Sequence, residues 1–147
     1  MLTAALVLAA PATAAATLTE SERALLTAVN AARTTRGLTP LRVDQNLTQA
    51  ARWHSRQLLA QGRLVHGDVS ERLHRFGARA GTLGENLAWG VGVHGHAWSI
   101  VVRWLNSPSH RANLLRPGFT SIGLGAAAGT FAGRPGATVV TADFAGV

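Results

Sequence analysis

Apolar residues recur every three or four positions in a segment near the start of the chain, which is the spacing of one helix face. Thr19 precedes this segment and Glu22 follows three residues later, the pattern of a capping box at a helix N-terminus. Gly37 can end such a helix, and Pro40 prevents its continuation. We therefore expect a first helix over residues 20–35, whose buried face carries Leu25, Ala28, Val29 and Ala32.

A second segment has the same helical spacing. Asp44 suits its N-cap, because an aspartate side chain accepts a hydrogen bond from a free backbone N–H, and Gly62 suits its end. His54 falls on the apolar face of this helix, which favours a core histidine with satisfied hydrogen bonds over a ligand. The full apolar face is Leu47, Ala50, Ala51, His54 and Leu58.

The next segments are shorter and more polar. Residues 63–69 predict a turn that contains His66. Ser70 is a candidate cap for a short helix that continues through Phe76. Residues 77–84 predict a loop, because glycine lies at both ends of this stretch.

The second half of the chain combines one apolar helix with short strands. Residues 97–106 predict the helix, which ends at residues 107–108 because proline disfavours helical geometry in the residue before it. Residues 87–89 predict a short strand, and residues 122–124 and 138–141 predict two strands joined by a loop rich in glycine and alanine. Helices that precede and separate a few antiparallel strands indicate a small, layered α+β domain.

The first 16 residues differ in composition from the rest. Residues 2–9 form an apolar run, and the small residues after it fit a cleavage site at 12–14 or 14–16. A positively charged opening is missing, so the segment is either a secretory signal that begins upstream or an alanine-rich tail. We favour a signal peptide or its remnant over residues 1–16, followed by one domain over residues 17–147. No later segment has the length that a transmembrane helix needs.

Composition narrows the classes of partner. The 147-residue chain has 14 arginines, no lysine and a net charge of +7, which favours anionic neighbours such as a wall polymer or a lipid surface. Nucleic acid is a poor candidate, because the arginines are spread from Arg23 to Arg134 without an aromatic and basic stripe. The absence of cysteine excludes disulfides and thiolate metal sites. We expect a secreted, extracellular or cell-envelope protein that is stabilised by its core.

Three short motifs stand out together: Leu64-Val65-His66-Gly67, Gly84-Glu85-Asn86-Leu87-Ala88, and Trp104-Leu105-Asn106-Ser107-Pro108-Ser109-His110-Arg111-Ala112-Asn113-Leu114-Leu115. Their order and spacing resemble the CAP superfamily, also called the SCP-domain family, and most closely its bacterial branch. That superfamily includes cysteine-rich secretory proteins, insect antigen 5 proteins and plant pathogenesis-related proteins. The similarity continues through residues 119–125 and 142–144, so it covers nearly all of the chain from Ser21 onward.

The resemblance implies a three-layer α-β-α sandwich with a small antiparallel sheet. Members of the family have a central cavity lined by two histidines and acidic residues, and in some members the histidines coordinate a metal ion, often zinc. The matching positions are His66, His110 and Glu85, which makes the two histidines the expected metal ligands. Ser107 stands where eukaryotic members place a second acidic residue, and this departure weakens any mechanism that requires two carboxylates.

Three further motif residues are expected to support the cavity. Asn86 and Asn113 are candidates for hydrogen bonds to loop backbone, and Trp104 is a candidate for the core or the cavity wall. The remaining histidines lie in charged or glycine-rich surroundings that favour solvent exposure over ligation. They are His74, His94 and His96.

These side chains leave two functions open. Two neutral imidazoles and a carboxylate can fill three positions of a tetrahedral zinc site and leave the fourth for water, whose pKa the metal lowers. In a zinc-dependent hydrolase of peptides or cell-wall material, Glu85 would be the general base. The same residues can instead form a buried polar network in a protein that binds a small amphipathic or envelope ligand. Without a metal, Glu85 would favour protonated histidines and make the cavity sensitive to pH. Ser107 favours binding over catalysis.

Overall fold

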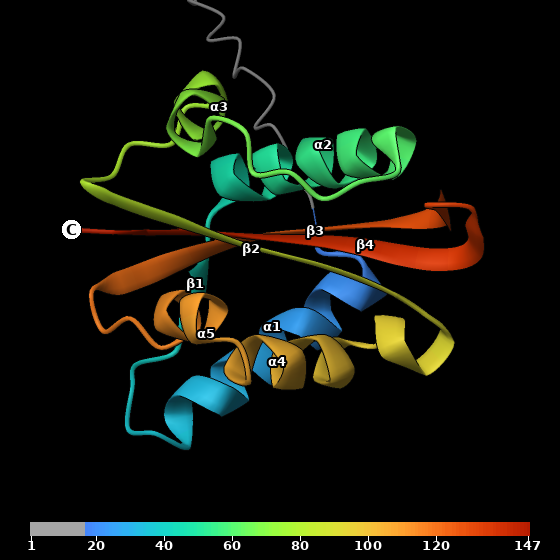
Figure 1. Cartoon of the computed structure of the whole chain (residues 1–147). Helices are drawn as coiled ribbons and strands as arrows, with labels where there is room; N and C mark the ends of the chain where they lie inside the picture. Colours follow the sequence, from blue (N-terminus) through green and yellow to red (C-terminus); the bar gives the residue numbers. More distant parts are fainter. Residues whose placement is uncertain (1–16) are drawn as a thin grey trace, which may run out of the picture.

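The computed structural model describes residues 17–147, in which a four-stranded sheet lies between two layers of helices (Figure 1). The leader predicted over residues 1–16 lies outside the described residues. The spatial order of the strands is β1-β3-β4-β2, so β2 forms one edge of the sheet. β1 pairs parallel with β3, and the other two pairings are antiparallel. The strands are β1 (Arg42–Val43), β2 (Thr82–Val91), β3 (Phe119–Phe131) and β4 (Arg134–Gly146).

The helices cover both faces of the sheet. One layer holds α2 (Gln45–Gln61) and α3 (Val69–Arg75), and the other holds α1 (Glu20–Thr34), α4 (Ala97–Leu105) and α5 (Pro108–Leu114) (Figure 1). A single 3₁₀ turn, η1 (Gly92–Gly95), connects β2 to α4. This arrangement confirms the predicted α+β class and the three-layer α-β-α sandwich. None of the helices between residues 17 and 147 is long and apolar enough to cross a bilayer.

Side-chain caps explain where α1, α2 and α3 begin. Thr19 and Glu22 form the predicted capping box of α1, with the Thr19 N–H donating to Glu22 Oε2 at 2.8 Å. Asp44 and Gly62 flank α2 as predicted. The predicted cap of α3, Ser70, is wrong: Asp68 accepts from the Glu71 N–H at 2.8 Å and starts the helix two residues earlier.

The sheet is larger than the apolar pattern predicts. β2 extends over ten residues and pairs with β4 along its whole length, so part of the loop expected at 77–84 is strand. The expected glycine-rich and alanine-rich loop between the last two strands is also strand, and the turn is confined to Ala132 and Gly133, both with positive φ. Pro108 ends α4 as predicted and then begins α5, a helix that the sequence did not predict.

Two glycines of β3 set the distance between α2 and the sheet. A Cβ at Gly123 would overlap the backbone of α2 at Leu47 and Thr48. A Cβ at Gly125 would overlap the α2 backbone at Ala51. The bare strand therefore lets α2 lie directly against the sheet, and this places the side chains of α2 close to the polar residues of β2 and β4.

A buried arginine holds the other helix layer to the sheet. Arg33, at the end of α1, is 0% exposed. Its guanidinium donates to the backbone carbonyls of Leu114 and Arg116 at 3.0 Å each, and to that of Phe119 at 3.3 Å. A further bond to the Thr39 carbonyl, at 3.0 Å, uses its Nε. Arg33 thus fixes the path of the chain from α5 into β3 by main-chain contacts alone.

Candidate functional site

Glu85 lies at the centre of a buried polar cluster on the edge strand β2. The residue is 5% exposed, and both carboxylate oxygens have partners. His66, in the loop before α3, bonds Glu85 Oε1 through its Nδ1 at 2.6 Å. Arg72, on α3, donates from Nη2 to Glu85 Oε2 and from Nη1 to the His66 carbonyl at 2.9 Å. Glu85 therefore joins the loop and α3 to the sheet.

Asp143 supplies a second buried carboxyl group to this cluster. It lies on β4 directly opposite Glu85 in the strand pairing, and it is 0% exposed. Arg72 Nη2 lies 3.4 Å from Asp143 Oδ1, while Asp143 Oδ2 has no hydrogen-bond partner. Asp143 falls within the matched stretch at residues 142–144, but the sequence alone indicates no role for it. The available signal was that Asp143 is the one acidic residue of the largely apolar strand β4.

The two carboxyl groups share an environment that disfavours two negative charges. Burial raises the pKa of Glu85 to about 7, although the charge of Arg72 acts in the opposite direction. Burial and the neighbouring charge of Glu85 raise the pKa of Asp143 well above its usual range. With one proton between the carboxyl groups, the cluster of Glu85, Asp143 and Arg72 carries no net charge.

His54 belongs to the same cluster, although the sequence indicates only a core residue. It is 6% exposed, as the core assignment requires, and its Nε2 lies 3.0 Å from the Val65 carbonyl and 3.7 Å from Glu85 Oε2. Burial and the positive charge of Arg72 lower the pKa of His54 to about 4. The imidazole is therefore neutral at pH 7 and uses its Nε2–H to bond the Val65 carbonyl.

His66 is the exposed member of the cluster. Its side chain is 54% exposed, whereas that of Glu85 is 1% exposed. When Glu85 is ionised, Nδ1–H donates to the carboxylate and Nε2 keeps a free lone pair. A histidine that is oriented in this way by a carboxylate is typical of metal ligands in proteins.

His110, the other predicted ligand, comes from α5 in the opposite helix layer. The Asn86 side chain donates to the His110 carbonyl at 2.9 Å, and Asn113 donates to the Glu85 carbonyl at 3.0 Å and to Asn86 Oδ1 at 3.1 Å. These bonds fasten α5 to β2. The two histidines therefore approach the same edge strand from its two sides.

The pKa values of both histidines differ from the sequence expectation. Partial burial of its ring lowers the pKa of His66 although the side chain is half exposed, with a further contribution from the charge of Arg72. Burial also lowers the pKa of His110, and the positive charge of His66 adds to the effect. The expectation that Glu85 favours protonated histidines is wrong, because Arg72 already occupies Glu85 and the environment of the rings disfavours a positive charge.

Trp104 and Ser107 have structural positions near this edge. Trp104 is 1% exposed and donates from Nε1 to the Leu87 carbonyl at 3.0 Å, so α4 is also fastened to β2. Ser107 is the N-cap of α5, but its side chain makes no capping hydrogen bond. Trp104, Asn86 and Asn113 thus fasten α4 and α5 to β2, whereas the Ser107 side chain makes no such bond.

The metal site predicted at His66 and His110 gains no third ligand from the described residues. Within residues 17–147 no group of three or more His, Cys, Asp or Glu side chains is arranged to hold a metal. Glu85 orients His66 and is held by Arg72, so it does not supply a third ligand. His66 and His110 would hold the ion, and water or a bound ligand would complete its coordination.

A cavity of about 260 Å³ lies beside His66, between α2, α3 and the loop that joins them. Its walls combine an indole, two imidazoles and two guanidinium groups with a few polar and acidic residues. Of the four predicted cavity residues, this wall contains His66 but not Glu85, Ser107 or His110. The lining residues are Trp53, His54, Gln57, Gln61, Val65, His66, Gly67, Asp68, Glu71, Arg72 and Arg75.

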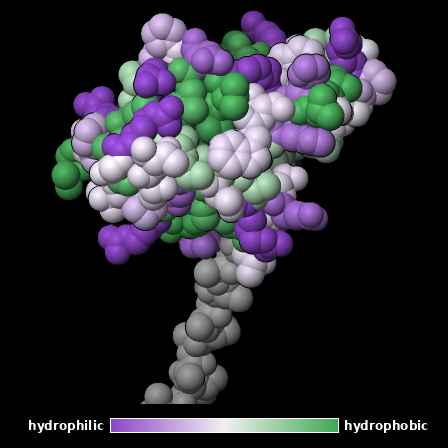
Figure 2. Space-filling view, turned by 90° about the horizontal axis from the view of Figure 1, so that it is seen from below, coloured by the Kyte–Doolittle hydropathy of each residue, from purple (hydrophilic) through white to green (hydrophobic). Residues whose placement is uncertain are grey.

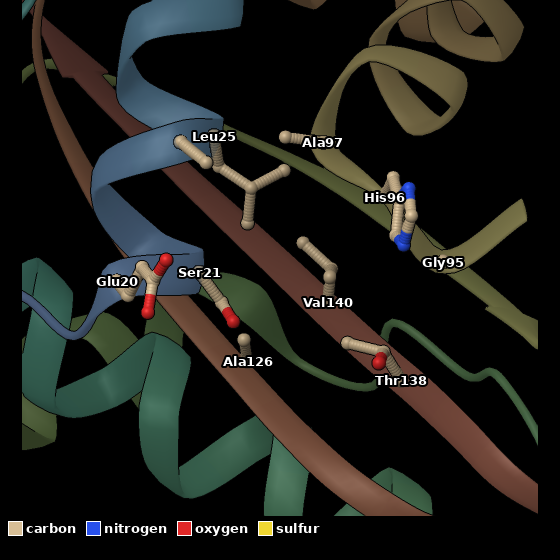
Figure 3. A pocket seen from close by; sticks show the side chains of 10 residues that line it. Glu20, Ser21, Leu25, Gly95, His96, Ala97, Ala126, Thr138 and Val140 are labelled. Carbon is tan, nitrogen blue, oxygen red and sulfur yellow. The ribbon is translucent and has the colours of Figure 1, made fainter. Parts of the chain in front are cut away.

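A second cavity of about 250 Å³ contains none of the predicted site residues. It lies between the start of α1, the start of α4 and the strands β3 and β4 (Figure 3). Leu25, Ala97 and Val140 give it apolar walls, while Glu20 and His96 lie at its border. It is separate from the cluster around Glu85.

Comparison with known proteins gives the chain a consistent set of relatives. The model of the CAP family, described as the cysteine-rich secretory protein family, matches residues 26–144. The uncharacterized protein YkwD of Bacillus subtilis strain 168 is 34% identical over an alignment of 109 residues, and the match covers 71% of this chain and 41% of that protein.

Solved structures agree with this result. An extracellular protein containing an SCP domain from Bacillus anthracis matches with a TM-score of 0.72 and 26% identity, over 86% of this chain and 40% of that one. An outer surface protein of Borrelia burgdorferi matches with a TM-score of 0.70 and 22% identity, over 87% and 94% of the two chains. The chain spans about two fifths of the Bacillus proteins.

Proposed function

Because this chain belongs to the CAP family and resembles its bacterial members, we propose that it is a secreted or envelope-associated protein that acts by binding, through the cavity beside His66. The Bacillus anthracis relative is described as extracellular and the Borrelia burgdorferi relative as an outer surface protein, which supports this location. The predicted leader is in keeping with the same location. The chain covers only part of the Bacillus relatives, so the proposal concerns the domain.

The state of Glu85 carries the argument for binding. A general base needs a carboxylate that can reach the substrate and accept its proton. Glu85 is buried, and its two oxygens are engaged by His66 and Arg72. Its geometry is that of a residue that orients His66, which leaves His66 Nε2 free toward the exposed side.

The cavity wall indicates the class of ligand. Trp53 and Val65 offer apolar surface, while the exposed Arg75 offers guanidinium donors that suit a carboxylate or a phosphate. Glu71 already pairs with Arg75 at 2.7 Å and offsets part of this charge. A small amphipathic envelope component with an anionic head fits this combination.

We also propose a site for a divalent metal next to this cavity. His66 and His110 would hold the ion, with zinc as the first candidate because it favours imidazole nitrogen. When bound, the metal would act as a Lewis acid toward oxygen atoms of the ligand. In this chain Glu85 orients the His66 ring, and Asn86 holds the backbone of α5 at His110.

Zinc titration by isothermal calorimetry tests the metal site. We expect one zinc per chain in the wild type, and loss of that binding in His66→Ala and His110→Ala. His74→Ala is the matched control, because His74 is an exposed histidine on α3 outside the site. Wild-type zinc affinity in His66→Ala would contradict the assignment of the two ligands.

The alternative is a zinc-dependent hydrolase of peptides or cell-wall material, with Glu85 as the general base. The second carboxyl group at Asp143 is the observation in its favour, since paired carboxyl groups serve several hydrolases. Incubation of the zinc-treated protein with peptides and wall fragments separates the two functions. Turnover that is lost in Glu85→Gln would replace the binding proposal, whereas stoichiometric zinc without turnover supports it.

A further inference from the structure

Exposed large hydrophobic side chains gather on one end of the α1, α4 and α5 layer. Four such residues are exposed among residues 17–147, and three of them lie on η1 and α4. Val93 is 64% exposed, Trp98 57% and Val102 48%. Trp98 and Val102 are four residues apart on α4 and so share one helix face. Hydrophobic and hydrophilic residues are intermixed on this side of the molecule (Figure 2).

Arg103 fixes η1 beside α4. Its Nη2 donates to the His94 carbonyl at 2.9 Å, and its side chain is otherwise exposed. This bond holds the turn that carries Val93 against the helix that carries Trp98. We call Val93, His94, Trp98, Val102 and Arg103 the α4 face.

The charge around the α4 face is predominantly positive. Residues 86–142 contain no aspartate or glutamate, but four arginines and three histidines. In the α1, α4 and α5 layer, the acidic residues are Glu20 and Glu22 at the start of α1. Glu22 is buried and paired with Arg52 at 2.6 Å, so it does not offset the exposed arginines. The layer is therefore basic, with exposed arginines at 23, 36, 103, 111 and 116.

We propose that the α4 face docks on an anionic lipid bilayer. Tryptophan favours the membrane interface, and transfer of the neighbouring aliphatic side chains from water into the bilayer lowers the free energy. Arginines on the same side attract anionic headgroups. A wall polyanion would be recognised by charge alone and gives no reason for exposed apolar residues, so the combination favours a bilayer. The inference rests on the proposed export and adds a surface separate from the His66 cavity.

Vesicle binding tests the proposal directly. The protein should cosediment with vesicles of phosphatidylcholine and phosphatidylglycerol. Vesicles of phosphatidylcholine alone should bind it at least about tenfold more weakly. Added salt should weaken the binding, because ions screen the headgroup charge. Absence of binding to the anionic vesicles, or equal binding to both kinds, would overturn the proposal.

Variants locate the surface. Trp98→Ser should lower the partition coefficient about tenfold, and Arg103→Gln about fivefold. Arg56→Gln is the matched charge control, because Arg56 is exposed on α2 in the opposite layer and should leave most of the binding intact. Unchanged binding in Trp98→Ser, or an equal loss in Arg56→Gln and Arg103→Gln, would contradict the α4 face as the docking surface.

Quenching by brominated lipids gives an independent readout. In the wild type, membrane binding should quench part of the tryptophan fluorescence, because Trp98 enters the lipid. Trp98→Phe should retain binding and lose that quenching. Quenching that persists in Trp98→Phe would mean that another tryptophan enters the bilayer and that the proposed surface is wrong.

The same proteins separate this inference from the proposed cavity function. Trp98→Ser should bind zinc as the wild type does, and His66→Ala should bind anionic vesicles as the wild type does. Failure of vesicle binding with intact zinc binding overturns the docking surface alone. Failure of zinc binding with intact vesicle binding overturns the metal site alone.

Discussion

Glu85 and Asp143 lie directly opposite each other on the antiparallel strands β2 and β4, and Arg72 reaches both carboxyl groups. The chain thus has a second carboxyl group near Glu85, although Ser107 stands where the family resemblance places an acidic residue. Asp143 is fully buried, however, and no substrate can reach it without a rearrangement of the core. The pair supports the architecture around His66.

The first prediction concerns the protonation of Asp143. A protonated carboxyl group resembles an amide, so Asp143→Asn should change the free energy of unfolding at pH 7 by less than about 1 kcal/mol. Asp143→Ala should cost about 2–3 kcal/mol, because it removes buried polar contacts and leaves space. Urea denaturation measures both. Equal destabilisation by the two variants would show that Asp143 is ionised.

The pH dependence of the same variant gives a second check. The pKa of Asp143 is higher in the folded than in the unfolded chain, so its stabilising contribution is complete below the usual carboxyl range and is lost as the pH rises. Asp143→Asn cannot titrate. Its stability relative to the wild type should therefore increase between pH 5 and pH 8, and a constant difference would contradict the raised pKa.

Arg72 should stabilise the fold more at high than at low pH. Arg72→Met removes the cation beside two buried carboxyl groups and should cost about 3 kcal/mol at pH 7.5. At pH 5 the loss should be smaller, because both groups are then largely protonated. Arg75→Met, three residues later on α3, is the control: its side chain is 60% exposed, so its loss should be within about 0.5 kcal/mol.

His54 should make the fold sensitive to acid. Its pKa is about 4 in the folded protein against an ordinary value of 6.5, so the unfolded chain takes up a proton first as the pH falls. The stabilising contribution is present above pH 6.5 and is lost toward pH 4, by up to about 3 kcal/mol. His54→Gln keeps a donor for the Val65 carbonyl but cannot titrate. Denaturation curves should show a shallower loss in this variant, and equal slopes would contradict the assignment.

The contact between α2 and β3 should not tolerate a methyl group. Gly125→Ala would place a Cβ within the backbone of α2 and should destabilise the protein by about 3 kcal/mol. Gly81→Ala is the control, because the nearest atom to its Cβ would be 3.8 Å away, and its effect should be within about 0.5 kcal/mol. A thermal melt compares the two. Similar melting temperatures would mean that α2 can move away from the sheet at little cost.

The sequence predicted the layered fold and the long helices α1 and α2, because those helices have a clear periodicity and local caps. It predicted α4 as an apolar segment that stops before Pro108. It did not predict the length of β2. Gly84, Glu85 and Asn86 interrupt the apolar pattern of that strand, since its two faces carry the polar groups that hold His66 and α5. Only the pairing with β4, some 60 residues later, identifies these residues as strand.

The candidate site was predicted in part. The motifs place Glu85 beside His66, and the structure brings these two together at 2.6 Å. They do not indicate Arg72, which lies among exposed charged residues on a seven-residue helix. A helix of that length is too short for its hydrophobic periodicity to show which face is buried. Its partners follow 13 and 71 residues later, a separation that no local pattern can reveal.

Arg33 contacts main-chain oxygens only, and this has a consequence for how the sequence can change. The side chains at positions 39, 114, 116 and 119 take no part in the bonds it makes. Each of those positions can therefore vary in divergent relatives without loss of the acceptor, whereas position 33 itself cannot. Because carbonyl oxygens do not titrate, these acceptors are unchanged in acid, whereas burial lowers the pKa of the Arg33 guanidinium, so only strong alkali could weaken this attachment.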